Sequence, residues 1–162
     1  MEEQVSIVDQ KNHVIGSAPR SQMRRDRLLH RATFIFVFNE ADEILVQKRT
    51  ASKDLYPGYF DLAAGGVVVV GESYDESAQR ELGEELGVFG IDLTTHFSFL
   101  YEDAATRCWG RVYSCRSDGP FTLQAEEVES VRFVSPMSVP NNEISPVTPD
   151  SLIALGRLLK LR

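Results

Sequence analysis

Residues 65–88 read GGVVVVGESYDESAQRELGEELGV, and this stretch decides how the fold is interpreted. Ser73 is followed three residues later by Glu76, which is the pattern of a capping box at the start of a helix. Gly87 is a typical residue at which a helix ends, because glycine adopts the left-handed conformation easily. The stretch therefore predicts a helix over about 74–86.

Three acidic residues crowd this predicted helix. Ala78 and Leu82 mark the face that packs on a core, and Glu81, Glu84 and Glu85 flank that stripe. Residues three and four apart on a helix are neighbours, and like charges at that spacing destabilise an isolated helix by roughly 0.2–0.5 kcal/mol per pair. The sequence therefore predicts that a cation or ample solvent compensates these acids.

The composition narrows the class of protein. The chain has 162 residues, of which 43% are hydrophobic and 25% charged, and this balance is typical of a folded domain and not of a disordered chain. Its formal net charge of -7 disfavours binding to nucleic acid or to an anionic membrane surface, since both usually need a basic footprint. A protein this acidic that handles an anionic substrate needs a local basic site or a metal ion.

The N-terminal segment and the cysteines indicate in which cellular compartment the protein is expected. The segment MEEQVSIVDQ lacks the basic and apolar regions of a signal peptide, and no apolar run approaches the roughly 20 residues that span a bilayer. Cys108 and Cys115 are too few for a disulfide framework, and their odd separation in a strand-like stretch places them on opposite faces. We therefore expect free thiols and a cytoplasmic protein.

The rest of the chain predicts strands with interspersed helices. We expect an N-terminal hairpin at about 4–20, a short helix capped by Ser21, and a C-terminal helix at about 149–161. The strand candidates lie at 32–39, 43–50, 96–103, 107–117 and 128–136, and residues 67–70 suit a buried strand or the approach to one. No linker interrupts this order, so the sequence predicts a single domain over 1–162 of the α/β or α+β layered class.

The glycines, acids and arginine of the opening stretch match a known pattern. Their spacing resembles the Nudix box, here residues 66–88, and each specified position is filled by Gly66, Glu72, Arg80, Glu81, Leu82, Glu84, Glu85, Gly87 and Val88. The resemblance implies an α/β fold, specifically a Nudix-type α/β/α sandwich with a mixed β-sheet. It also implies a pyrophosphohydrolase that cleaves the diphosphate linkage of a nucleoside diphosphate joined to a second group.

The box also implies a metal site. Mg²⁺ prefers oxygen ligands, usually one or two carboxylates together with water and substrate phosphate. By resemblance, Glu81, Glu84 and Glu85 bind Mg²⁺, or Mn²⁺ in its place, with the Gly66 carbonyl as a further ligand. The alternative is a solvated acidic helix face braced by Arg80.

The remaining roles divide between catalysis and architecture. Glu84 and Glu85 are candidates for the chemistry, and Arg80 is grouped with them because its planar fork pairs with a carboxylate and holds the loop. Glu72 and Gly87 are assigned to the structure of the motif. The base that activates the attacking water stays open among Glu84, Glu85, Glu102, Glu126 and Glu127.

Residues 28–61 resemble the isopentenyl diphosphate isomerase branch of the Nudix fold. In that branch an arginine and a lysine bind the diphosphate, and they align with Arg49 and Lys53, for which exposed basic residues are the alternative. His30 aligns with a metal ligand of the isomerases, although a histidine at a strand entry also serves in capping or packing. The isomerases carry Cys-Gly-His where this chain has Gly-Gly-Val at 65–67, so the chain resembles a hydrolase on an isomerase-like frame.

Three functions therefore follow from the sequence, with a metal-dependent diphosphate hydrolase favoured. An isomerase of prenyl diphosphates and a catalytically silent nucleotide-binding module are the alternatives. The box does not identify the substrate, because residues outside it recognise the leaving half. Phe60, Tyr101 and Trp109 are candidates for stacking on a base or for ordinary packing. The expected partner is a small-molecule diphosphate, and a homodimer is an open option.

Overall fold

The structure, a computed structural model, describes residues 2–161, and a mixed sheet organises it. The central strand β3 (His30–Phe38) runs parallel to β7 (Arg107–Arg116), which pairs antiparallel with β6 (Thr94–Glu102). On its other side, β3 meets β1 (Gln4–Val8), which forms a hairpin with β2 (Val14–Pro19). Met1 and Arg162, the first and last residues of the predicted domain, lie outside the described residues.

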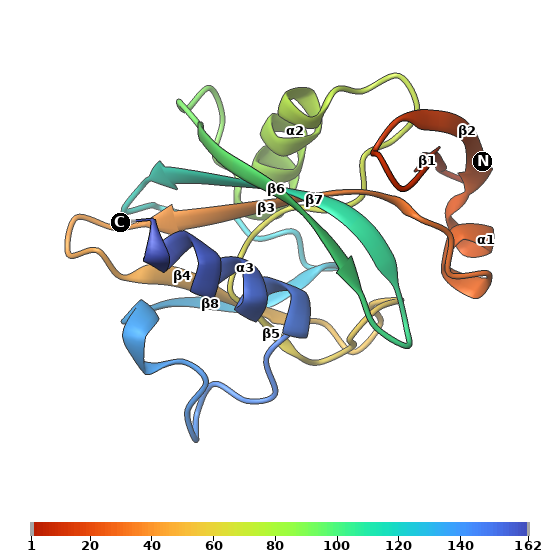
Figure 1. The fold of residues 1–162 in the computed structure, drawn as a ribbon. Coiled ribbons are helices and arrows are strands. Elements are labelled where there is room, and N and C mark those ends of the chain that lie inside the picture. Colours follow the sequence, from red (N-terminus) through yellow and green to blue (C-terminus); the bar gives the residue numbers. More distant parts are fainter. Residues whose placement is uncertain (1, 162) are drawn as a thin grey trace.

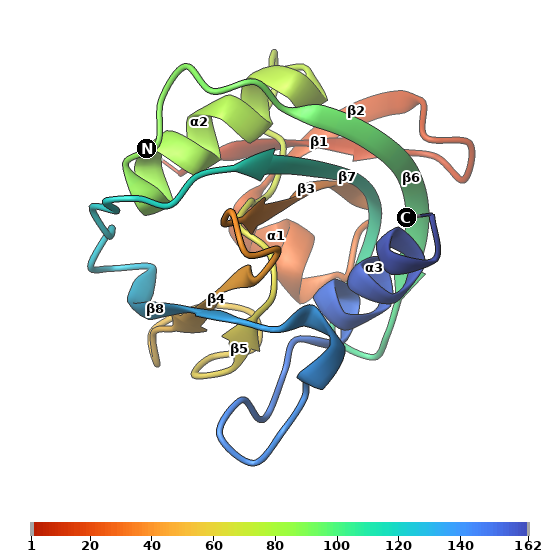
Figure 2. The ribbon, with the colours of Figure 1, turned by 90° about the vertical axis from the view of Figure 1, so that its left-hand side faces the viewer.

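The second half of the sheet diverges from the first. Strand β4 (Ile44–Arg49) pairs with β3 only at their shared turn, through Phe38 and Ile44. It continues between β8 (Val128–Val134) and the two-residue β5 (Phe60–Asp61). Figure 2 shows β4, β5 and β8 separated from β3 and β7, with the loop before α2 running between them. The sheet therefore opens toward the site described below.

Two helices cover opposite faces of the sheet, as Figure 1 shows. Helix α2 (Tyr74–Leu86) packs on Ile35 and Val37 of β3, while α3 (Pro149–Lys160) packs in the cluster that holds Phe34, Phe36 and Phe38. Alternate residues of a strand point to opposite faces, so β3 supplies both cores. The arrangement is the expected α/β/α sandwich with a mixed sheet. A short helix α1 (Arg20–Arg25) and a 3-10 turn (Pro136–Ser138) complete the elements.

Helix α2 begins and ends where the sequence predicts. The Ser73 hydroxyl accepts from the Glu76 backbone N–H at 3.1 Å, and the Glu76 carboxylate accepts from the Ser73 N–H at 3.0 Å. Gly87 closes the helix in the left-handed conformation, with φ of 70°. Inside the helix, a Cβ on Gly83 would lie 2.5 Å from the Phe89 ring, so the missing side chain lets that ring pack against the helix.

One local prediction is wrong, and of the two alternatives left open for residues 67–70 the strand does not form. Ser21 does not cap α1, which begins after Pro19, and the Ser21 backbone N–H instead donates to the Glu2 carboxylate at 2.6 Å. Residues 67–70 do not form a strand but cross the sheet as a loop, with single bridges from Val67 to Ala32 and from Val69 to Val5. At Ser21, the carboxylate of Glu2, which is distant in sequence, replaces the local cap. At residues 67–70, the diverging sheet leaves no continuous strand edge with which this segment could pair.

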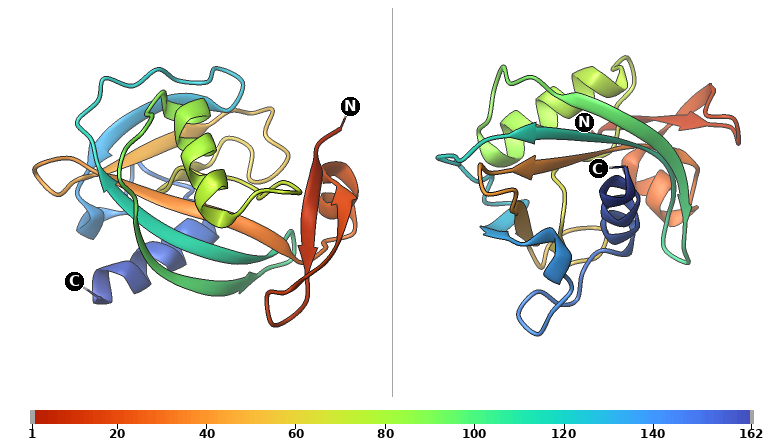
Figure 3. Two further views of the ribbon diagram at one scale, coloured as in Figure 1. Left: turned by 90° about the horizontal axis from the view of Figure 1, so that it is seen from above. Right: turned by 60° about the vertical axis from the view of Figure 1, so that its left-hand side comes forward.

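The cysteines lie as expected, buried and free, on opposite faces of β7. Cys108 belongs to the core under α3, and Cys115 to the core under α2. The hairpin of β1 and β2 and helix α1 lie together at one end of the molecule, which Figure 3 shows from above. Among the described residues, no helix combines the length and apolar character needed to cross a membrane.

Candidate active site

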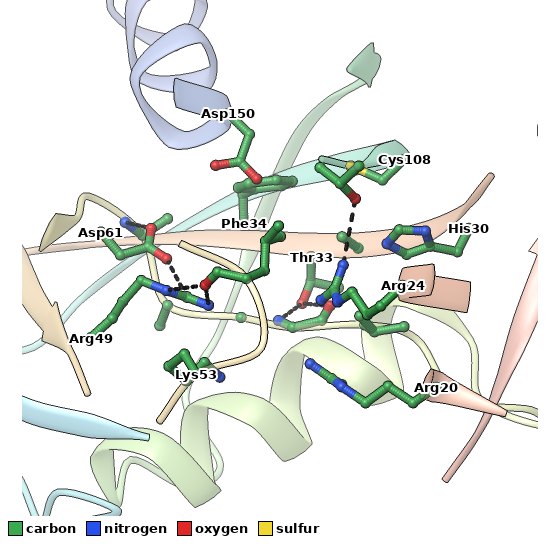
Figure 4. A pocket seen from close by; sticks show the side chains of 18 residues that line it. Arg20, Arg24, His30, Thr33, Phe34, Arg49, Lys53, Asp61, Cys108 and Asp150 are labelled. Carbon is green, nitrogen blue, oxygen red and sulfur yellow. Dashed lines mark hydrogen bonds and ion pairs between the residues drawn. The ribbon is translucent and has the colours of Figure 1, made fainter. Parts of the chain in front are cut away.

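Two adjoining cavities lie where the sheet opens. The outer cavity, of about 370 Å³, lies beside α2 and is lined by Glu3, Arg20, Ser52, Lys53, Asp54, Gly65, Gly66, Arg80, Glu81, Glu84, Glu85, Gln124, Glu126 and Glu127. The inner cavity, of about 70 Å³, extends toward the start of α3 (Figure 4). Arg20, Lys53, Gly65 and Gly66 line both cavities and so form their junction.

The carboxylates of Glu81 and Glu85 are the most buried acids of the outer cavity. Glu85 is only 6% exposed, and its pKa lies well above the ordinary value because of burial and the neighbouring Glu81 charge. Burial also raises the pKa of Glu81, against the opposing effect of Arg80. Two acids pressed together away from water favour a cation between them, since a cation offsets both the repulsion and the lost solvation.

Gly66 provides the room for this acid pair. A Cβ added at Gly66 would lie 2.6 Å from Glu81 Oε1, so only glycine lets the carboxylate lie against the backbone here. The Gly66 carbonyl accepts from Thr33 N at 2.9 Å and from Thr33 Oγ1 at 3.3 Å. These hydrogen bonds compete with the metal contact predicted for that carbonyl.

Arg80 braces the motif as its planar fork predicts. Its Nε and Nη2 donate to the two oxygens of Glu72 at 2.5 and 3.0 Å. Its Nη1 lies 3.1 Å from both Glu81 Oε1 and Glu84 Oε2. Glu72 in turn accepts from the Val69 backbone N–H at 3.2 Å. Arg80 therefore joins the loop at 67–72 to the acidic face of α2.

Glu84 differs from its two neighbours in exposure. Its side chain is 48% exposed, against 14% for the Glu81 side chain, and its recorded partner is Arg80. Glu84 therefore lines the outer cavity with about half of its side chain open to solvent.

A second wall of the outer cavity comes from two loops. Lys53 forms an ion pair with Glu127, and Thr50 Oγ1 donates to the Glu126 carbonyl at 2.9 Å. Burial lowers the pKa of Lys53, with a further contribution from Arg49, while the charge of Glu85 opposes both. The basic loop and the acidic turn at 126–127 therefore close over the glutamates of α2 from the opposite side.

The predicted diphosphate residues Arg49 and Lys53 do not share one environment. Lys53 lies at the junction of the cavities, whereas Arg49 lines only the inner one. The Arg49 guanidinium donates to Asp61 Oδ2 at 3.0 Å and to the Leu55 carbonyl at 2.7 and 3.1 Å. Arg49 thus holds the 50–58 loop against β5, as Figure 4 shows for its pairing with Asp61.

Sequence reasoning missed two arginines of α1. Arg20 and Arg24 share the carboxylate of Asp54, with Nε to Oδ2 distances of 2.9 and 3.3 Å. These two cations hold the pKa of Asp54 well below its ordinary value despite burial. The residues lie one helical turn apart, and that spacing predicts a shared face, but no local pattern predicts which cavity the face lines.

His30 lies in the inner cavity and not with the glutamates. It is 2% exposed, and its Nδ1 lies 2.9 Å from the Leu28 carbonyl, which is the packing role that the sequence left as an alternative. Burial lowers its pKa to about 4, with Arg24 and Arg20 adding to the effect, so the ring is neutral at physiological pH.

Other candidates lie away from both cavities. Glu102, at the end of β6, lines neither cavity, so Glu84, Glu85, Glu126 and Glu127 are the base candidates that the structure brings together. Phe60 and Tyr101 pack in the core under α3, and Trp109 lines neither cavity.

The acids of the outer cavity suit a cation that is bound partly by the protein and partly by the substrate. Within residues 2–161, no three His, Cys, Asp or Glu side chains converge as a complete protein-only metal site. Mg²⁺ does not need one, because it usually takes one or two carboxylates and completes its shell with water and phosphate. The buried Glu81–Glu85 pair against Gly66 supplies those two carboxylates.

Gly65 distinguishes this site from the active site of the isomerases that the chain resembles. Gly65 has φ of 134°, and a Cβ there would overlap the Thr33 carbonyl. The backbone therefore has no room for the cysteine that an isomerase carries at this position. Val67 adds no ligand, since its side chain is apolar and buried.

Comparisons with known proteins show the family of this chain. A family model described as NUDIX domain matches residues 28–153. An uncharacterized Nudix hydrolase of Yersinia pestis is 49% identical over 154 residues, covering 95% of this chain and 84% of that protein. The uncharacterized Nudix hydrolase YfcD of Escherichia coli (strain K12) is 46% identical over 158 residues, covering 98% and 87%.

Solved structures are similar in fold. The crystal structure of DR0079 from Deinococcus radiodurans has a TM-score of 0.83 at 24% identity and covers 96% of this chain and 98% of that chain. The NUDIX domain of Shewanella oneidensis NrtR, complexed with ADP ribose, has a TM-score of 0.67 at 17% identity and covers 82% and 88%.

Proposed function

The chain belongs to the Nudix hydrolase family and is a Nudix pyrophosphohydrolase, and from this premise we propose that it cleaves nucleoside diphosphate-X substrates with the help of Mg²⁺. The observation that carries the proposal is the acid pair of α2, in which Glu85 is buried and Glu81, with 14% of its side chain exposed, lies against Gly66. Burying two acids together is costly unless a cation joins them, so the pair is suited to a metal-bound state. The NrtR domain complexed with ADP ribose supports a substrate of this class.

In this proposal Glu81 and Glu85 hold Mg²⁺ from one turn of α2. When held there, Mg²⁺ would supply charge neutralisation of the diphosphate and polarisation of the phosphoanhydride. Lys53, at the junction of the cavities, adds a positive charge beside the same diphosphate. Arg80 fixes the glutamates through Glu72 and the 67–72 loop, so that the carboxylates do not have to reorganise during the reaction.

The outer cavity also supplies the group that removes a proton from water. Glu84 is exposed to solvent beside the buried pair, and Glu127 faces it from the opposite wall. A diphosphate that binds Lys53 competes with the ion pair from Lys53 to Glu127 and so frees that carboxylate. Glu84 and Glu127 are therefore the two candidates for the general base, which must come within hydrogen-bond reach of the attacking water.

Isomerase chemistry and silent binding are less well supported. The overlap that a Cβ at Gly65 would create excludes a cysteine from the position where isomerases use one. A module that only binds nucleotides has no need of a buried acid pair whose pKa values are raised, because both acids cost stability without a cation.

Replacing one buried acid tests the proposal. We expect Glu85→Gln to lower the release of AMP from ADP-ribose and from adenine dinucleotides by at least about a hundredfold, since one charged ligand is lost. Mn²⁺ binding, measured by electron paramagnetic resonance, should weaken in parallel. Glu129→Gln, which alters an exposed acid on β8, is the matched control and should leave both unchanged. Equal turnover by wild type and Glu85→Gln would rule out the proposed role.

A further inference from the structure

The inner cavity contains an acid, Asp150, that forms no ion pair among the described residues, although the charge of Arg49 acts on it. Asp150 projects from the first turn of α3 toward the cavity, near Phe34 and Cys108 (Figure 4). One of its oxygens accepts from the Ser151 backbone N–H at 2.8 Å. Within the described chain, no other donor reaches its carboxylate and no cation lies within 4 Å of it.

The other charges of this cavity are already paired. Arg49 is paired with Asp61, and Arg20 and Arg24 are paired with Asp54. These cations are therefore not available to neutralise Asp150 without giving up their own partners. Burial, with the nearby charge of Asp61, raises the pKa of Asp150 to about 7. A carboxyl group in this state favours a ligand that donates a hydrogen bond or carries a positive charge.

The size of the cavity limits what such a ligand can be. A cavity of about 150 Å³ holds one benzene molecule, which has six heavy atoms. The inner cavity, at about 70 Å³, therefore has room for roughly three heavy atoms and not for a nucleobase. The nucleoside of a substrate must lie in the outer cavity or in solvent.

The positions of the lining residues along the inner cavity indicate how a bound ligand would be oriented. Arg20 and Lys53 lie at the junction with the outer cavity, while Asp150 and Phe34 lie at the end near α3. If a diphosphate binds at the junction, the group esterified to it would extend into the inner cavity. The carbon atoms of that group would then lie near Phe34, and its terminal atom would lie near Asp150. A second phosphate at that end is disfavoured, because it would face the carboxyl groups of Asp150 and Asp61.

We propose that the inner cavity is a specificity site for the X group of a nucleoside diphosphate-X, and that X is a short chain ending in an ammonium or hydroxyl group bound by Asp150. This inference rests on the proposed function, since it places the diphosphate beside Glu81 and Glu85. Asp150 then acts in substrate recognition and does not take part in the bond cleavage.

Two ligands that differ in one group test this site. We choose the 2-aminoethyl ester and the ethyl ester of ADP, which share the nucleotide and differ by the terminal ammonium. Both esters are made on α,β-methylene-ADP, whose bridge is not hydrolysed, and binding is measured by calorimetry on wild-type protein in Mg²⁺. We expect the aminoethyl ester to bind at least about tenfold more tightly, as a charge-assisted hydrogen bond predicts.

Variants then assign the preference to one residue. Asp150→Asn keeps an oxygen that can accept from Ser151, and we expect it to reduce the ratio of the two affinities to about one. Asp92→Asn, which alters an exposed acid before β6, should retain the tenfold ratio of wild type. The wild-type ratio needs no variant, so a folding defect in Asp150→Asn does not remove the test.

The outcomes separate this inference from the proposed function. Equal affinity for the two esters in wild type, or a preference that survives in Asp150→Asn, overturns the specificity site. That result leaves hydrolysis untouched, because turnover of ADP-ribose in Mg²⁺ and its loss in Glu85→Gln are measured separately. A preference for the aminoethyl ester without any turnover would instead contradict the proposed function alone.

Discussion

Gly66 shows how much of the site depends on one absent side chain. Its backbone has no positive φ, so alanine is tolerated there by the main chain. The added Cβ would lie 2.6 Å from Glu81 Oε1 and 2.8 Å from Glu81 Cδ, and must push that carboxylate away. The cost therefore falls on the position of a candidate metal ligand more than on the fold.

We expect Gly66→Ala to lower activity by about tenfold or more and to weaken Mn²⁺ binding, because a displacement of about 1 Å at a reacting centre can cost up to a hundredfold. The midpoint of urea unfolding should change little, since the end of a flexible side chain can move aside. Gly16→Ala is the control, because nothing lies within 4 Å of a Cβ at that exposed position. A large loss of stability with intact metal binding would contradict this account.

Helix α2 is an element that the sequence predicts correctly, because the residues that begin and end it all lie within one short stretch. The capping box joins residues three apart, and Gly87 ends the helix within the same stretch. The failed prediction of a Ser21 cap is instructive by contrast, because Glu2 reaches the Ser21 N–H from a distant part of the chain. Single-sequence patterns therefore predict an end that local groups stabilise and miss one that tertiary contacts decide.

The cap makes a quantitative prediction for this element. Ser73→Ala removes the oxygen that accepts from the Glu76 N–H, and we expect unfolding free energy to fall by about 1 kcal/mol. Activity at 25 °C should persist, because the buried face of α2 still packs against β3 and keeps its glutamates in place. Ser130→Ala on β8, an exposed site, should change stability by no more than about 0.5 kcal/mol. Urea titrations of the three proteins measure the difference.

At the scale of the whole molecule, the sequence predicts the acids of the outer cavity but not the inner cavity. Glu81 and Glu85 belong to one continuous motif, whereas Arg24, Cys108 and Asp150 come from three distant elements. They meet only because β4 diverges from β3 after a single shared pair. No local periodicity encodes that divergence, so the meeting of these three residues in one cavity could not be predicted from the sequence, although Arg49 and Lys53 of the same cavity were candidates.

The buried acid pair also couples the fold to pH and to metal. Because the folded state raises the pKa of Glu85 above its ordinary 4.5, the folded metal-free protein binds more protons than the unfolded chain in the window between the two values. Stability contributed through Glu85 is therefore lost as pH rises through that window. Glutamine does not titrate, so Glu85→Gln should gain stability relative to wild type as pH increases from 5 to 8.

Urea titrations in EDTA at several pH values measure this difference, and a difference that stays constant or falls with pH would contradict it. Mg²⁺ should reverse the order of stability. A ligand at a hundred times its dissociation constant stabilises a folded protein by about 2.7 kcal/mol, and we expect wild type to bind the cation more tightly than Glu85→Gln does. The same carboxylate then destabilises the empty protein and stabilises the loaded one, as expected for a residue whose role is to hold a cation.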